Sequence, residues 1–293
     1  MASRSVKLSG HRLPLVSIIT PSLNQGRYLR ACLQSVEAQD YPRIEHIVID
    51  GGSSDETVDV LRSSPQLAYW TSQPDKGQAA AINEGMRRAR GPICSWLNAD
   101  DLLLPSAVRI AVSCLGADVA AVYGDRLTID AKGNVLDLLR HPPYYRTMFA
   151  RNITIPQETT FFWKDLFDEV GGLDEDLHFA LDFDLWVRLA RRRALLHVPA
   201  VLGAYRFHEG SKTAEAAVRG STAPRWLVEH GIVYRRLFGR ALPTGLEAAY
   251  YRLCHHARRV GFARSGDYRR TQMELAALRS QPLAVDGHDG VAG

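Results

Sequence analysis

The sequence predicts an α/β fold, in which a mostly parallel sheet is covered by helices and followed by a helical extension. Between residues 15 and 123, short apolar runs alternate with runs of helical spacing. Repeated alternation of strand and helix is typical of a parallel sheet with helices on both faces. Polar residues gather directly after these predicted strands, and ligands of such sheets bind at the carboxyl ends of strands. We expect residues 1–213 to form one catalytic domain, and 214–293 to form the extension with a disordered end.

The predicted strands of the first half are compact runs rich in Ile, Val and Leu, and the predicted helices carry an apolar stripe. In the helix 27–38, for example, Tyr28, Cys32 and Val36 share one face. Helix-terminal signals support the helices: Gly91-Pro92 ends one, and Pro105 begins another. The strands are expected at 15–20, 44–50, 67–71, 93–97 and 119–123, and the helices at 27–38, 78–90 and 105–115, with a further helix opened by a Ser53-x-x-Glu56 capping box.

After residue 125 the pattern becomes irregular. The turn Ala131-Lys132-Gly133-Asn134 between two apolar runs indicates a hairpin. Further on, we expect helices at 144–150 and 182–192, strands at 159–163, 195–198 and 201–205, and a mainly helical chain from about 213 onward. Trp186 lies on the apolar stripe of its helix, which favours a place in the core over stacking on a ligand.

Composition narrows the classes of protein. The 293 residues carry a formal net charge of +4, and the charged fraction of 23% is ordinary for a globular protein. The four cysteines have no paired spacing, which argues against a zinc site and against a disulfide framework. No apolar run approaches the length of a membrane span, and no apolar leader opens the sequence. We therefore expect a cytoplasmic protein.

Three loops at the predicted sheet edge carry acidic residues. The second strand ends at Asp50, the third leads to Asp75-Lys76-Gly77, and the fourth ends in Asn98-Ala99-Asp100-Asp101. Hard divalent cations bind through one or two protein carboxylates and leave other positions for phosphate and water. Such an ion neutralises a diphosphate leaving group. Asp100 is placed to bind it, and Asp101 to cap the next helix.

Seven segments in their order and spacing resemble glycosyltransferase family 2, whose members have the GT-A fold. They cover roughly residues 14–213 and are VSIITPSLNQGRYLRACLQSV (16–36), HIVIDGGSSDETVDVL (46–61), PDKGQAAAINEGMRRARG (74–91), SWLNADD (95–101), VGGLDEDL (170–177), LDFDLWVRLA (181–190) and YRFHEGSKT (205–213). The resemblance implies a metal-dependent, inverting transfer of one sugar from a nucleoside-diphosphate sugar, with a UDP-sugar favoured as donor, to an acceptor hydroxyl. The family's processive members carry membrane-spanning helices and a Gln-x-x-Arg-Trp motif, and this sequence has neither.

The resemblance also implies roles for single residues. Asn98 and Asp100 match the family's D-x-D motif, with Asn in place of the first Asp, so that Asp100 would bind Mn²⁺ or Mg²⁺ and Asn98 a ribose hydroxyl. His208 matches a position that in some relatives binds the metal or the diphosphate. The residues expected to bind the donor are Thr20 and Pro21 beside the base, Asp50 on the base imide, Asp75 in the same pocket, and Lys76 and Arg206 toward the diphosphate.

Asp182 stands where the family has its catalytic base. An inverting transfer needs one carboxylate to take the proton of the attacking hydroxyl. The family has Glu-Asp here, whereas this chain has Leu181-Asp182. Asp184 is the rival, and because helix positions two apart face different ways, only one of the two should reach the site. The alternative for Asp182 is a helix N-cap.

Two questions remain open from sequence. Residues 221–282 hold eleven Arg against four acidic residues, interleaved with aromatics. This segment either packs and dimerises or contacts an anionic membrane surface, where a lipid-linked acceptor or another glycan of a cell-surface polysaccharide would be met; no nucleic-acid motif accompanies the charge. The alternatives to a glycosyltransferase are a nucleotidyltransferase and a non-catalytic carbohydrate-binding or scaffold protein on the same fold.

Overall fold

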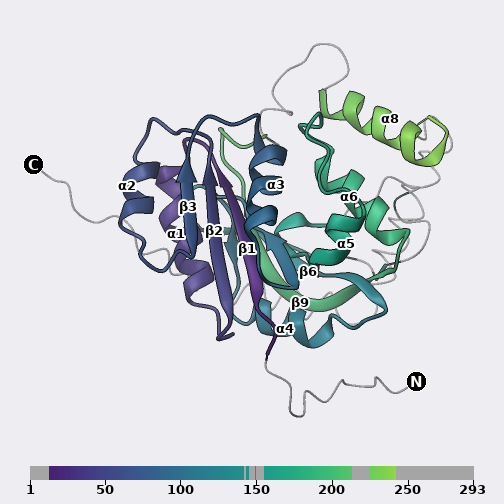
Figure 1. Ribbon diagram of the computed structural model, residues 1–293, viewed down its shortest axis with the longest axis horizontal. Helices are drawn as coiled ribbons and strands as arrows, with labels where there is room; N and C mark the ends of the chain where they lie inside the picture. Colours follow the sequence, from purple (N-terminus) through teal and green to yellow (C-terminus); the bar gives the residue numbers. More distant parts are fainter. Residues whose placement is uncertain (1–12, 142, 145–148, 150–154, 213–224, 242–293) are drawn as a thin grey trace, which may run out of the picture.

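The structure is a computed structural model, and it describes residues 13–141, 143–144, 149, 155–212 and 225–241 (Figure 1). Its central feature is one nine-stranded sheet with the strand order β3-β2-β1-β4-β8-β6-β9-β5, in which β7 pairs with β6. The expected helix 144–150 falls mostly outside the described residues.

The first half of the sheet is parallel, as predicted. β1 (Val16–Ser22) pairs with β2 (Ile44–Asp50) on one side and with β4 (Ile93–Trp96) on the other, and β3 (Tyr69–Ser72) pairs with β2. The carboxyl ends of these four strands therefore lie along one edge, which brings their loops together.

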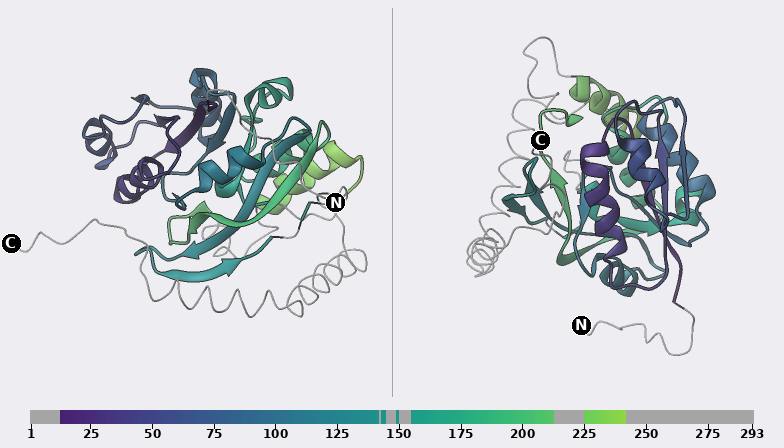
Figure 2. Two further views of the ribbon diagram at one scale, coloured as in Figure 1. Left: turned by 90° about the horizontal axis from the view of Figure 1, so that it is seen from below. Right: turned by 90° about the vertical axis from the view of Figure 1, so that its left-hand side faces the viewer.

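The second half of the sheet is mixed, in the part of the chain where the sequence pattern becomes irregular. β8 (Phe161–Trp163) lies antiparallel between β4 and β6 (Val119–Ile129). β9 (Ala194–Arg206) runs parallel to β6 as one long strand, where two short strands were expected, and Figure 2 shows the pair side by side. The antiparallel strands β5 (Leu102–Leu103) and β7 (Val135–Leu139) pair with β9 and β6, so the predicted hairpin at 131–134 is confirmed.

Helices cover both faces of the sheet, and alternate residues of β1 show which helix covers which face. Ile18 packs in a cluster with α1 (Gly26–Glu37) and α4 (Ala107–Cys114), while Ile19 packs in a cluster with α3 (Gln78–Arg88), α6 (Leu181–Ala190) and α8 (Arg225–Phe238). Figure 1 shows α2 (Thr57–Arg62) beside α1, and α5 (Lys164–Glu169) beside α6. Among the described helices, none is long and apolar enough to cross a membrane.

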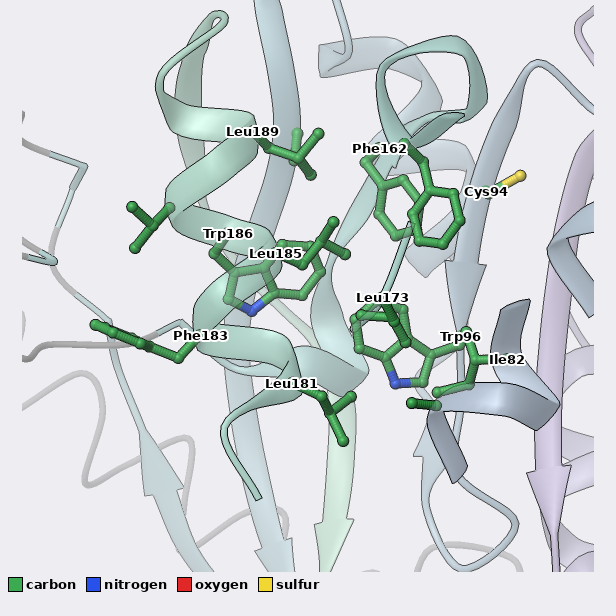
Figure 3. Packing of buried hydrophobic residues seen from close by; sticks show 14 of the residues in the cluster. Ile82, Cys94, Trp96, Phe162, Leu173, Leu181, Phe183, Leu185, Trp186 and Leu189 are labelled. Atoms are coloured by element: carbon green, nitrogen blue, oxygen red, sulfur yellow. The ribbon is translucent and has the colours of Figure 1, made fainter. Parts of the chain in front are cut away.

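Stacked aromatic rings bind α6 to the sheet. Trp186 of α6 stacks on Trp96 of β4 with 5.2 Å between ring centroids, and Phe162 meets both rings edge-on (Figure 3). Trp186 is fully buried, so the expected place in the core is confirmed. Because Trp96 directly precedes the Asn98–Asp101 loop, this packing holds α6 in a fixed relation to that loop.

Two expected helix caps are wrong. The helix after Gly52 begins at Thr57 without a side-chain cap, because the Ser53 hydroxyl donates to Asp50 instead. The helix after Asp101 begins at Ala107, too far along the chain for that carboxylate to cap it. In both places the side chain that the local pattern assigned to capping instead forms a hydrogen bond with a residue outside the helix.

Candidate functional site

The candidate site lies at the carboxyl edge of the parallel strands. The register places Ser22 beside Asp50 and Asp50 beside Ser72, and β4 leads into the Asn98–Asp101 loop next to β1. The acidic loops singled out by the sequence are therefore neighbours in space.

Asp50 holds the loop that follows β2. Its carboxylate accepts hydrogen bonds from the amides of Gly52 (3.2 Å) and Ser53 (2.9 Å) and from the hydroxyls of Ser53 (2.5 Å) and Ser72 (2.6 Å). An ionised carboxylate offers about four acceptor positions. These contacts fill them in a side chain that is fully buried. Recognition of a base imide by Asp50 stays a prediction, and its local role is to shape the turn.

Asp75 lies in the open beside that turn. Its Oδ1 accepts the Gly77 amide at 2.7 Å, and a Cβ added to Gly51 would stand 3.1 Å from its Oδ2. The absence of a side chain at Gly51 thus lets the Asp75 carboxylate approach the β2 loop. Lys76 is exposed at the same place. Of the two acids expected to bind the donor, Asp50 is buried and Asp75 is exposed, so the Asp75 carboxylate is the accessible one.

The Thr20 side chain faces the interior. Its hydroxyl is 2.8 Å from Nε2 of His46, and burial lowers the pKa of that imidazole to about 3, which keeps it neutral. Pro21 is buried as well. These two residues can border a bound base only through the backbone at the end of β1.

A directed series of hydrogen bonds runs through Asn98. The Lys212 ammonium donates to Oε1 of Gln78 at 2.6 Å, and the Gln78 amide donates to Oδ1 of Asn98 at 2.7 Å. The Asn98 amide then donates to Oε1 of Gln157 at 3.0 Å, and the Gln157 amide donates to the Trp96 carbonyl. An Asp at position 98 could accept from Gln78 but could not donate to Gln157. The network gives a local reason for Asn at this position.

Asp100 and His208 meet at the mouth of the site. Nε2 of the imidazole lies 3.0 Å from Oδ2 of Asp100, and the ring packs against Tyr28 with 4.7 Å between centroids. A carboxylate oxygen and an imidazole nitrogen so close together suit Mn²⁺ or Mg²⁺, whose remaining positions phosphate and water would fill. Among the described residues there is no cluster of three or more metal-binding side chains. The pair can supply two protein ligands, and an ion shared with a diphosphate at this place stays a prediction.

Arg206 is 1% exposed and contacts the Asp100 loop from the protein interior. Its Nε donates to the Asp100 carbonyl at 2.8 Å, Nη1 donates to the Asp130 carbonyl, and its backbone amide donates to Asp101. Sequence analysis predicted a contact with the diphosphate, but the buried guanidinium has almost no surface for one in this conformation. We expect it to position Asp100.

Two buried acids lie behind the loop. Asp101 and Glu158 are 1% and 3% exposed, and burial together with the charges of Asp100 and Glu158 raises the pKa of Asp101 well above its ordinary value. Oε1 of Glu158 has no hydrogen-bond partner among the described residues, and the closest cation is Arg126 at 3.5 Å. Burial and, to a smaller extent, the charge of Glu158 raise the pKa of Asp182.

Asp182 is the second residue of α6, so it does not occupy the cap position, and its role as the base stays a prediction. Ala180 is the N-cap, and Oδ1 of Asp182 accepts the Phe183 amide at 2.7 Å. Burial raises the pKa of Asp182 to about 6, a value suited to a general base near neutral pH. The rival Asp184 is fully buried and bonded to Arg188 and Arg236, so it has a structural role.

Sequence analysis singled out neither Gln78 nor Lys212 as a binding residue. Lys212 donates to the His178 carbonyl as well as to Gln78, and its charge lowers the pKa of Asp182. The only available signals were the polar first turn of the helix after Gly77 and the Ser-Lys-Thr sequence at 211–213. Neither pattern indicates where a side chain will point.

Residues 17–167, just over half of the chain, match the family model described as glycosyl transferase family 2. The chain belongs to this family. It is 38% identical over 187 residues to an uncharacterized glycosyltransferase of Mycobacterium tuberculosis, with 60% of this chain and 69% of that protein covered. It is also 28% identical over 193 residues to chondroitin synthase of Escherichia coli, covering 64% of this chain and 28% of that protein.

Solved structures share the fold. TarS 1–349 of S. aureus in complex with UDP-GlcNAc superposes with a TM-score of 0.62 at 16% identity, covering 90% of this chain and 78% of that one. The mannosyltransferase PcManGT of Pyrobaculum calidifontis, in complex with GDP-Man and Mn²⁺, gives 0.56 at 20% identity, covering 94% and 89%. Of a longer TarS chain, only 37% is covered. The fold of this family 2 enzyme is of the GT-A type, and the enzyme is a glycosyltransferase that depends on a nucleotide sugar.

Proposed function

We propose that this glycosyltransferase transfers one sugar, with inversion, from a UDP-sugar to an acceptor hydroxyl, using Mn²⁺ or Mg²⁺. The observation that carries the proposal is the Asp182 carboxylate: burial raises its pKa to about 6, and it lies within range of the charge of Lys212, which bonds Gln78 and through it Asn98. The complexes of structural neighbours with UDP-GlcNAc and with GDP-Man and Mn²⁺ support this class of donor and cofactor.

The donor lies across the carboxyl edge of the sheet in this proposal. Asp75, exposed beside Gly51, accepts a hydrogen bond from the base, and Lys76 faces the phosphates. Asp100 and His208 hold the divalent cation, and Arg206 keeps the Asp100 backbone in place through its carbonyl. The cation supplies charge neutralisation for the departing diphosphate.

Asp182 takes the proton of the acceptor hydroxyl as the oxygen attacks the anomeric carbon. The new C–O bond forms on the face opposite to the diphosphate, the bond from the anomeric carbon to the phosphate oxygen breaks, and the nucleoside diphosphate leaves with the electron pair. One carboxylate is sufficient, because the leaving group is already a weak base when its charge is neutralised. The single base implies inversion at the anomeric carbon.

A screen of nucleotides separates this function from the alternatives. The chain belongs to glycosyltransferase family 2, which argues against a nucleotidyltransferase. A non-catalytic protein on this fold would not bind nucleotide together with metal. We expect UDP with Mn²⁺ to raise the melting temperature, since ligand at 100 times Kd adds about 2.7 kcal/mol of stability. Metal or nucleotide alone should do much less. Absence of any nucleotide effect in the presence of metal would contradict the proposal.

For the acceptor we propose a glycan or a lipid-linked saccharide of a cell-surface polysaccharide, met at the inner membrane surface. Supporting it, α8 exposes Leu227, Val228 and Ile232 next to Arg235, a mixture of apolar and basic side chains suited to anionic lipid. Co-sedimentation with anionic vesicles, and not with neutral ones, is expected. Sedimentation with neither, together with a dimer in solution, would favour the packing alternative.

A further inference from the structure

We propose that Glu229 of α8 is a positioning residue that holds the start of α6, and with it the base Asp182, in the geometry for proton transfer. The inference rests on the proposed role of Asp182. It extends the catalytic machinery into the segment beyond residue 213 that the sequence assigned to a separate extension.

The contact is a single carboxylate oxygen with three backbone donors. Oε2 of Glu229 accepts the amides of His178 at 2.9 Å, Phe179 at 2.6 Å and Ala180 at 3.2 Å. These residues immediately precede α6, which begins at Leu181. The first amides of a helix lack partners within it, and the helix N-terminus attracts negative charge.

The chain offers no local substitute for this carboxylate. Ala180 is the N-cap of α6 and makes no side-chain cap hydrogen bond. Of the two acids in the first turn, Asp184 is bonded to Arg188 and Arg236, and Asp182 bonds the Phe183 amide through Oδ1, which leaves its other oxygen for an acceptor. Glu229, about fifty residues further along the chain, therefore acts as the cap of α6. Asp182 keeps one carboxylate oxygen available for catalysis.

Two further residues of α8 contact residues that follow Asp182 in α6. The His230 ring stacks on Phe183 with 4.9 Å between centroids, and Arg236 bridges Asp184 and Asp174 with N–O distances of 2.5 and 2.6 Å. Along the chain, Asp182 therefore lies between two sets of contacts that α8 makes with the start of α6. Val233 and Tyr234 of α8 are fully buried in the same core cluster as α6.

A positioning role and a merely structural role predict different kinetics. Loss of position at the base lowers kcat and spares the binding of nucleotide, which is made at the loops after β2, β3 and β4. General loss of structure lowers both together. The comparison of kcat with nucleotide affinity therefore decides between them.

The experiment compares Glu229→Ala, Glu229→Gln and the control Glu169→Ala. Glu169 bonds Arg192, just beyond the other end of α6, in an exposed ion pair at 3.1 Å, so its removal tests a surface contact of the same helix. Hydrolysis of UDP-glucose, UDP-GlcNAc and GDP-mannose with Mn²⁺ gives kcat for the best donor with water as acceptor, and UDP titration gives affinity. Hydrogen exchange reports on the amides of 178–183 in the same samples.

We expect Glu229→Ala to lower kcat about tenfold or more, leave UDP affinity within twofold, and speed exchange at 178–183. Glu229→Gln, whose amide oxygen still accepts a hydrogen bond, should recover part of kcat, and Glu169→Ala should match the unaltered chain. Should the alanine variant not fold, the glutamine variant is judged alone, with an intermediate kcat expected. A kcat within twofold of the unaltered chain, or equal losses of kcat and UDP affinity, overturns the inference. An active Asp182→Asn variant would instead refute the proposed base.

Discussion

Replacement of Asp182 by Asn should make the protein more stable at neutral pH while it abolishes transfer. Burial raises the pKa of Asp182 to about 6, whereas an aspartate in an unfolded chain titrates near about 3.9. The folded state therefore holds this proton more tightly than the unfolded state does. The stability from Asp182 is present below about pH 4 and is lost as the pH rises through about 6.

The size of the effect follows from the two pKa values. A difference of about two units at about 1.4 kcal/mol each gives an upper value of about 3 kcal/mol. Asp182 is partly exposed, so screening by water lowers the expected gain to about 1–3 kcal/mol. Asn keeps an oxygen for the Phe183 amide and removes only the charge. For a chain of 293 residues the gain corresponds to a rise in Tm of about 2–5 °C.

Thermal melts without metal or nucleotide, at pH 4.5, 6 and 7.5, measure the difference between the two proteins. We expect it to be small at pH 4.5 and to grow through pH 6. Asp176→Asn, which neutralises an exposed acid on the loop before α6, is the matched control and should show no such growth. If Asp182→Asn melts at or below the temperature of the unaltered chain at pH 7.5, the assignment of Asp182 as a desolvated carboxylate is wrong.

Further substitutions test the neighbouring parts of the site. Asp100→Ala should remove the stabilisation that Mn²⁺ adds to bound UDP, measured by thermal shift, and an unchanged Mn²⁺ effect would show that the cation binds elsewhere. Asn98→Asp cannot donate to Gln157 and should lower the free energy of unfolding by about 1–3 kcal/mol in urea melts, whereas equal stability would mean that the amide network is dispensable. Gly203→Ala would place a Cβ 2.7 Å from the Glu158 carbonyl oxygen and should cost about 1–3 kcal/mol, with a neutral result excluding the close approach of β9.

The parallel half of the sheet could be predicted because each of its elements is a local pattern. The expected strand 44–50 coincides with β2, and the other early strands and helices differ by a few residues at their ends. The loops of Asp50, Asp75 and Asp100 meet at one edge as a direct consequence of parallel pairing. The grouping of the acidic loops at one edge followed from topology alone.

The mixed half could not be predicted in the same way. β8 lies between β4 and β6 although it comes later in the chain than both, and a run of three residues, Phe161–Trp163, carries no periodicity that names its partners. The two expected strands before residue 206 form a single β9, because pairing with β6 carries the strand through Pro199 with irregular register. Long-range pairing decides these features.

The contacts of single side chains could not be predicted from the sequence either. Asp50 and Arg206 were expected to bind the donor, and the structure adds contacts that the sequence did not indicate: Asp50 bonds Ser53 and Ser72, and Arg206 is buried against the Asp100 carbonyl. The hold of Glu229 on α6 joins residues about fifty positions apart and has no pattern in the sequence. Motifs identified the loops at the carboxyl edge of the sheet. Only the three-dimensional contacts distinguish the side chains that hold these loops in place from those that face a ligand.

The most direct test of the central claim measures donor turnover and nucleotide binding in Asp182→Asn and the unaltered chain side by side. With Mn²⁺ and the best UDP-sugar, we predict that the variant binds UDP with the affinity of the unaltered chain and loses turnover by several orders of magnitude. If the variant turns over the donor at a comparable rate, Asp182 is not the base, and the catalytic carboxylate has to be sought elsewhere on the sheet edge.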